Sequence, residues 1–122
     1  MMTKPNWIDL VKEFNAAYGV KAPDPYDEYS LNLQWRLIDE EIQELSDASN
    51  DIEFLDAIGD IIYVLIGLAL KMGYDLDGAF CEIHRSNMSK LGPDGKPIYR
   101  DDGKILKGPD YTPPDLAPFT YC

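Results

Sequence analysis

Two short stretches of the chain gather acidic side chains at helical spacing. The first, LIDEEIQEL at residues 37–45, contains Glu40, Glu41 and Glu44, and the second, DAIGDIIYV at residues 56–64, begins with Asp56 and has Asp60 one turn later. On a helix, Glu41 and Glu44 share a sector with leucines that should be buried, whereas Glu40 points away. Buried carboxylates need a partner, so these residues are candidates for cation binding.

The geometry of a helical hairpin predicts that the two acidic stretches meet. An antiparallel fold about the turn at residues 48–51 brings Asp56 level with Glu41 and places Asp60 about 5.4 Å further along. Between Asp27 and Ile83 the only basic residues are Arg36 and Lys71, so the carboxylates would repel one another. Mg²⁺, or Mn²⁺ in its place, takes oxygen ligands and would relieve this repulsion. The predicted metal ligands are Glu41, Glu44, Asp56 and Asp60.

Two further observations limit the acidic site: one gives Glu53 a structural role, and the other argues against di-iron chemistry. Glu53 follows Asn50 by three residues, a spacing that favours a helix-capping box over metal binding. The Glu-x-x-His pattern of di-iron carboxylate proteins is absent, which argues against ferritin-like oxygen chemistry.

Apolar periodicity predicts an all-α chain, a four-helix antiparallel bundle with an extended C-terminal tail. In the second helix the apolar residues repeat at spacings of four and three, which indicates a core stripe that includes Trp35 and Ile42. The third helix is apolar on more faces than three short neighbours can cover, so we expect dimerisation to complete the core. The expected helices span residues 5–18, 27–48, 51–72 and 75–91.

The composition changes after residue 91. We expect residues 1–91 to form the helical domain and residues 92–122 to form a Gly/Pro-rich tail packed on it. Residues 98–106, IYRDDGKIL, could close a short hairpin. Basic residues collect in the tail, which either folds over the acidic site or remains a solvated extension.

Size and charge narrow the possible classes of protein. A chain of 122 residues with 45% hydrophobic content fits one domain. Its net charge of -11 argues against nucleic acid or membrane surfaces as partners. The apolar run at residues 61–70 is too short to span a membrane.

Cys81 and Cys122 lack metal-ligand spacing, and two free thiols suggest a reducing, cytoplasmic location.

The ordered segments EEIQE, DAIGDIIYV and EIHRSNMSK, followed by the tail DGKPIYRDDGKILKGPDYTPPDL, resemble the MazG-like all-α nucleoside triphosphate pyrophosphohydrolases. The similarity covers about residues 30–116 and is greatest to the phosphoribosyl-ATP pyrophosphohydrolase-like branch. It implies an Mg²⁺-dependent hydrolase that splits a nucleoside triphosphate into a monophosphate and pyrophosphate. Glu41 and Glu44 match the family's first acidic pair and Asp60 its final aspartate. The remaining glutamate would fall on Ala57, so Asp56 is the expected substitute.

The resemblance also implies substrate contacts. It points to Asn87 and Lys90 near the end of the fourth helix, although a helix cap and a surface lysine explain them equally well. Gln34 and Trp35 are candidates to meet the base, and Glu44 or Glu40 is a candidate general base. We expect a homodimer or homotetramer acting on a nucleotide. Two alternatives remain open: a phosphoribosyl-ATP pyrophosphohydrolase of histidine biosynthesis and a non-catalytic helical interaction module.

Overall fold

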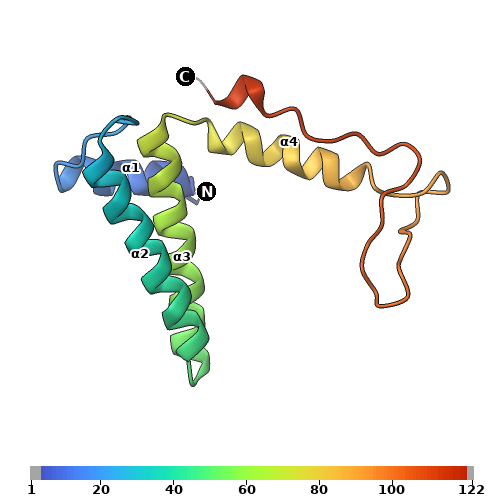
Figure 1. Cartoon of the computed structure of the whole chain (residues 1–122), viewed down its shortest axis with the longest axis horizontal. Helices are drawn as coiled ribbons and strands as arrows, with labels where there is room; N and C mark the ends of the chain where they lie inside the picture. Colours follow the sequence, from blue (N-terminus) through green and yellow to red (C-terminus); the bar gives the residue numbers. More distant parts are fainter. Residues whose placement is uncertain (1–3, 121–122) are drawn as a thin grey trace. The chain divides into compact units, whose positions relative to one another are not determined.

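The structure is a computed structural model that describes residues 4–120, and its regular elements are helical. Within these residues there is no strand, only an isolated antiparallel bridge between Tyr99 and Ile105. The prediction of an all-α chain with four helices is confirmed, and each helix ends within about three residues of its expected limits. The elements are α1 (Trp7–Ala17), α2 (Glu28–Asp47), α3 (Asp51–Met72), α4 (Leu76–Met88) and a 3-10 helix, η1 (Ala117–Phe119) (Figure 1).

The turn between α2 and α3 is fixed by the predicted capping box. The side chain of Asn50 accepts a hydrogen bond from the backbone N–H of Glu53 at 2.9 Å, and the Glu53 carboxylate accepts one from the backbone N–H of Ser49 at 3.1 Å. At the other end of α3, Gly73 has a φ of 80°, a left-handed conformation that glycine adopts without strain. These caps set where α3 begins and ends.

The chain forms two compact units that divide between Tyr74 and Asp75. In the first unit α2 packs along α3 as an antiparallel hairpin, and α1 packs against α3 (Figure 1). The second unit contains α4 and the C-terminal segment. The domain boundary expected at residue 91 stays a prediction, although contacts within the chain group α4 with the tail.

The buried core of the first unit is small. Its buried apolar side chains are Val11, Ile38, Ala57, Ile66 and Ala69. The expectation that the whole apolar stripe of α2 is core was wrong, because Trp35 is 57% exposed and Ile42 is 52% exposed. One face of α2 lies on α3, and the flanks of that face remain accessible.

Large apolar side chains of α3 are also accessible in the single chain. The dimerisation that the sequence predicts would cover them, and it stays a prediction. These side chains are Ile52, Phe54, Leu55, Ile58, Tyr63 and Leu65.

A buried lysine ties the loop before α2 to the end of α3. The Nζ of Lys71 donates a hydrogen bond to the carbonyl oxygen of Lys21 at 2.8 Å and lies 4.0 Å from a carboxylate oxygen of Asp27. The backbone N–H of Asp24 in turn donates to the carbonyl oxygen of Lys71 at 2.8 Å. The ammonium is therefore satisfied although Lys71 is only 6% exposed.

In the second unit, the tail is held along α4 by polar contacts. Arg85 donates to the Thr112 hydroxyl at 2.6 Å, and the buried Ser86 hydroxyl donates to the Thr112 carbonyl oxygen at 2.8 Å. The Glu82 carboxylate accepts a hydrogen bond from the backbone N–H of Asp115 at 2.7 Å. Residues 112–115 are thereby fixed on this helix.

The expected short hairpin is present in the tail. The backbone N–H of Leu106 donates to the carbonyl oxygen of Ile98, and that of Arg100 donates to the carbonyl oxygen of Lys104, both at 2.8 Å. Gly103 takes the left-handed conformation in the turn, with a φ of 89°. The Asp-Gly sequence therefore closes a turn, as its chemistry predicts.

Two further observations bear on the cysteines and on membranes. Cys81 is a free, exposed thiol, and the prediction for Cys122 lies outside the described residues. None of the helices in residues 4–120 is long and apolar enough to cross a membrane.

Candidate metal site

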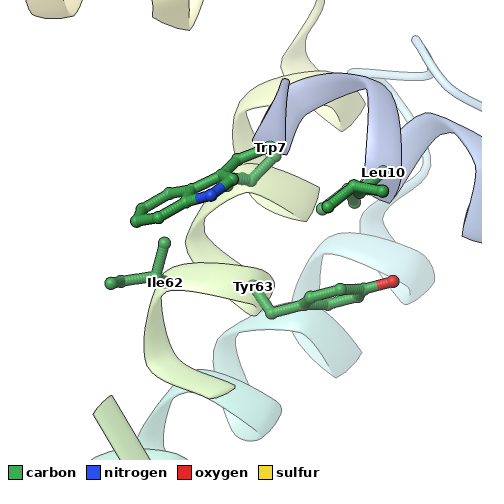
Figure 2. Close-up of a pocket in the computed structure, with 6 residues that line it drawn as sticks. Trp7, Leu10, Ile62 and Tyr63 are labelled. Carbon is green, nitrogen blue, oxygen red and sulfur yellow. The ribbon is translucent and has the colours of Figure 1, made fainter. Parts of the chain in front are cut away.

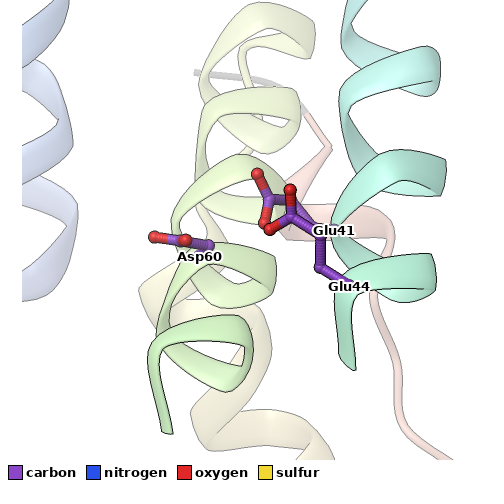
Figure 3. Close-up of side chains that lie close together, drawn as sticks. All are labelled: Glu41, Glu44 and Asp60. Carbon is purple, nitrogen blue, oxygen red and sulfur yellow. The ribbon is translucent and has the colours of Figure 1, made fainter. Parts of the chain in front are cut away.

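Three carboxylates from α2 and α3 converge between the two helices. One oxygen from each of Glu41, Glu44 and Asp60 lies within 4.8 Å of the other two. Figure 3 shows Glu41 and Glu44 extending from α2 toward α3, which carries Asp60. The convergence follows from local structure, because Glu41 and Glu44 are neighbours across one helical turn and the capped turn at Asn50 fixes the hairpin.

The chemistry of this cluster suits a hard divalent cation. Oxygen Oε2 of Glu41 is buried without a hydrogen-bond partner among the described residues, and burying such a group unpaired is unfavourable. None of the salt bridges found in residues 4–120 involves the three carboxylates. The available donors are all oxygens, which Mg²⁺ and Mn²⁺ prefer. The residues therefore fit such a metal ion.

The electrostatic environment of the cluster favours protonation when no cation is bound. The pKa of Glu41 is raised mainly by burial, then by the neighbouring Glu44 carboxyl and by the charges of Asp60 and Asp56. Burial also raises the pKa of Asp60, with added repulsion from Asp56 and Glu44. A bound cation would favour the ionised forms and oppose both shifts.

The other predicted acidic residues lie outside the group of three. Asp56 and Glu40 are exposed, and Asp56 contributes charge to the site rather than a converging oxygen. Glu53 caps α3. Ala57, where the resemblance would place a glutamate, is buried and only 2% exposed.

The predicted substrate contacts on α4 belong to the second compact unit. Asn87 is exposed within the last turn of the helix, and Lys90 is half-buried just beyond it. The carbonyl oxygen of Lys90 accepts a hydrogen bond from the backbone N–H of Gly108 at 2.8 Å. Their roles in substrate binding stay predictions.

Gln34 occupies the space between α2 and α3, which the sequence did not indicate. Its Nε2 donates a hydrogen bond to the carbonyl oxygen of Val64 at 2.6 Å. Gly67 lies beside this amide, and a Cβ at that position would be 2.9 Å from the same nitrogen. A glycine inside an otherwise apolar helix was the signal that could have pointed to this close approach.

An apolar pocket of about 190 Å³ lies between α1 and α3. Figure 2 shows Trp7 and Leu10 of α1 facing Ile62 and Tyr63 of α3. Tyr63 follows Asp60 by three residues, so the pocket begins about one helical turn from the acidic cluster. Trp7 is 63% exposed. The lining residues are Trp7, Leu10, Val11, Ile62, Tyr63 and Ile66.

Comparison with known proteins assigns the chain to a family. Residues 9–87 match the family model described as phosphoribosyl-ATP pyrophosphohydrolase. The chain belongs to this family, which confirms the resemblance seen in the sequence. The matched segment includes all of α2 and α3 and most of α1 and α4.

The proteins that are similar to the chain include a viral protein and a bacterial protein of solved structure. The uncharacterised protein L479 of Acanthamoeba polyphaga mimivirus is 35% identical over 107 residues, which cover 80% of this chain and 40% of that protein. The chain thus spans about two fifths of the length of this relative. A solved structure from Exiguobacterium sp. 255-15, described as a candidate NTP pyrophosphohydrolase, is 23% identical, with 92% of this chain and 90% of that chain covered and a TM-score of 0.44.

Proposed function

We propose that the protein hydrolyses a nucleoside or deoxynucleoside triphosphate between the α and β phosphates, yielding a nucleoside monophosphate and pyrophosphate. The observation that carries this proposal is the convergence of Glu41, Glu44 and Asp60. One oxygen of this cluster, Oε2 of Glu41, is buried and has no hydrogen-bond partner among the described residues. The family to which the chain belongs supports pyrophosphohydrolase chemistry. The proposed cofactor is Mg²⁺, with Mn²⁺ as a substitute.

The three carboxylates have distinct proposed roles. Glu41 and Asp60, which are partly buried, would hold the metal ion with Glu44. A divalent cation supplies charge neutralisation at the phosphates and lowers the pKa of a bound water. Glu44 is the most exposed of the three, so its carboxylate can also take a proton from the attacking water, with Glu40 one turn before it as the second candidate.

Charged and polar groups outside the cluster complete the proposal. Asp56 adds negative charge that favours retention of the cation. We assign Lys90 to the leaving pyrophosphate, because an ammonium neutralises a phosphate as a point charge. Asn87 is a proposed hydrogen-bonding contact to the substrate. Self-association into a dimer or tetramer would cover the exposed apolar residues of α3.

The apolar pocket offers a place for the base of the nucleotide. Trp7 and Tyr63 present aromatic rings at the pocket, and stacking of a base on such a ring contributes roughly 1–3 kcal/mol. We therefore expect Trp7→Ala to raise the KM for a nucleoside triphosphate by about fivefold or more. Trp35→Ala is the comparison variant, because Trp35 is the other tryptophan, lies on α2 outside the pocket and is the base contact that the sequence suggested. A larger KM effect from Trp35 would move the base to the exposed side of α2.

A second activity is favoured by one observation. The matching family is named for phosphoribosyl-ATP, an adenine nucleotide whose triphosphate could be cleaved at the same three carboxylates. A non-catalytic helical module would need neither a metal ion nor a nucleotide.

One experiment separates these functions. Purified protein is incubated with the common ribonucleoside and deoxyribonucleoside triphosphates and with phosphoribosyl-ATP, and pyrophosphate release is measured with Mg²⁺, with Mn²⁺ and with EDTA. We expect metal-dependent release from at least one triphosphate. Preference for phosphoribosyl-ATP would establish the alternative activity, and release of no pyrophosphate from any substrate would refute both. Full turnover in EDTA would refute the metal mechanism.

A further inference from the structure

Gln34 makes a directed contact between the two helices that carry the acidic cluster. Its Nε2 donates to the Val64 carbonyl oxygen over 2.6 Å. Among residues 4–120, no other side-chain hydrogen bond joins the body of α2 to that of α3. Apolar contacts alone are non-directional, so they tolerate a small slide of one helix along the other. The hydrogen bond from Gln34 is directional, so such a slide would break it.

The position of this contact relates it to the metal site. Gln34 precedes Glu41 by seven residues, which places both on nearly the same face of α2, two turns apart. Val64 follows Asp60 by four residues, so in an α-helix the N–H of Val64 donates to the Asp60 carbonyl. The amide of Gln34 is therefore attached to the helical turn that presents Asp60.

Gly67 provides the room that the Gln34 amide needs. A Cβ built on Gly67 would lie 2.9 Å from Nε2 and 3.7 Å from the amide carbon of Gln34. Glycine in the middle of a helix is unfavourable relative to alanine, and here it allows the glutamine to approach the α3 backbone. Gly59 is a useful contrast, because a Cβ there would have no neighbour within 4 Å.

We propose that Gln34, seated against Gly67, is a positioning residue that sets the register of α2 on α3 and thereby the separation between Glu41 and Asp60. The inference rests on the proposed metal site. It assigns to Gln34 a role in cation affinity that acts through Glu41 and Asp60, without contact to the cation. Metal binding should therefore respond to changes at Gln34 and at Gly67 in the same way.

The test measures Mn²⁺ affinity of the full-length protein by titration calorimetry and by electron paramagnetic resonance, at a temperature where each variant is folded by circular dichroism. Gln34→Leu removes the hydrogen bond at similar volume, and Gly67→Ala displaces the amide. We expect each to weaken Mn²⁺ binding by about tenfold, the lower end of the effect of residues that orient metal ligands. Gly59→Ala is the matched control and should bind Mn²⁺ within about twofold of the original protein, because its methyl group meets open space.

A double variant separates positioning from general stability. In Gln34→Ala/Gly67→Ala the side chain that would clash is absent, so Mn²⁺ affinity should fall no further than in Gln34→Ala alone. Equal Mn²⁺ affinity in the original protein, Gln34→Leu and Gly67→Ala would overturn the proposal, even if the melting temperatures differ.

Pyrophosphate release is measured on the same samples. Mn²⁺ binding that depends on Gln34 without any hydrolysis would refute the proposed function and leave the positioning role intact. Hydrolysis with unchanged Mn²⁺ affinity in the variants would refute the positioning role and leave the proposed function intact. Absence of Mn²⁺ binding by the original protein would overturn both.

Discussion

Glu41 on α2 and Glu82 on α4 are the same residue type in opposite electrostatic situations. Glu41 is partly buried among other carboxylates, and its pKa is raised. Glu82 accepts hydrogen bonds from Arg85 and from the backbone N–H of Asp115, which lower its pKa to about 2. Glu82 already has its partners, so it holds the tail on α4. Oxygen Oε2 of Glu41 has no partner among the described residues, and this difference supports the proposal of a cation at the α2–α3 cluster rather than at α4.

The largest expected effect comes from removing a charge at the cluster. Asp60→Asn or Glu41→Gln should lower metal-dependent pyrophosphate release by about a hundredfold or more, since even residues that only orient metal ligands change activity 10–100-fold. The helical circular dichroism signal should remain, because neither side chain makes a required fold contact. Pyrophosphate release and Mn²⁺ titration provide the measurements.

Glu82→Gln is the matched control for these substitutions, because it removes the same charge from the other region. Mn²⁺ affinity should stay within about twofold of the original value, in contrast to the loss at the cluster. If Glu82→Gln weakened Mn²⁺ binding as much as Glu41→Gln, the distinction between the two carboxylates would fail.

The second prediction concerns the pH dependence of stability in EDTA. The folded-state pKa of Glu41 is raised above its ordinary value of 4.5, so the folded state holds the proton more tightly than the unfolded chain. The resulting stability is present below pH 4.5 and is lost as pH rises through the raised pKa. Glu41→Gln should therefore melt at a higher temperature than the original protein at neutral pH, by a margin that shrinks toward pH 4.

Glu82 should show the opposite sign. Its pKa is lowered from 4.5 to about 2, so its stabilising effect is present above pH 4.5 and is lost as pH falls toward about 2. Thermal melts of Glu82→Gln from pH 7 to about pH 2 should converge with those of the original protein at the acidic end. The two variants could instead show the same pH dependence of the melting-temperature difference from the original protein. That result would contradict the opposed pKa shifts.

The smallest expected effect is structural and lies in the second unit. The buried Ser86 hydroxyl donates to the Thr112 carbonyl oxygen, and its loss in Ser86→Ala should lower the free energy of unfolding by about 1 kcal/mol. Urea denaturation measures this change, with the exposed Ser46→Ala as the control. Mn²⁺ affinity should not change. A change in metal binding in Ser86→Ala would connect α4 to the cation site.

The sequence predicted those parts of the fold that depend on local chemistry. Asn50 and Glu53 identified the start of α3 because capping requires particular residue types at a fixed spacing. The meeting of Glu41 with Asp60 followed from that turn. The exposure of Trp35 could not be predicted, because helical periodicity shows which residues share a face but does not show what covers it.

Gln34 illustrates a second limit of sequence reasoning. Its partner is the backbone carbonyl of Val64, and every residue has such a carbonyl, so no complementary side chain appears in the sequence. The pocket beside Trp7 was equally hidden, since it depends on the angle at which α1 crosses α3. Contacts to backbone and cavities between helices require coordinates.

The enclosed ammonium of Lys71 makes the loop at residues 21–27 observable by chemical labelling. An amine-reactive reagent modifies a free, deprotonated amine, and the Lys71 amine must first leave the Lys21 carbonyl oxygen. The Lys21 side chain on the same loop is 80% exposed and serves as an internal reference for reagent activity. The ratio of acylation rates at the two lysines therefore reports how often this loop detaches from the end of α3 while the remainder of the chain stays folded.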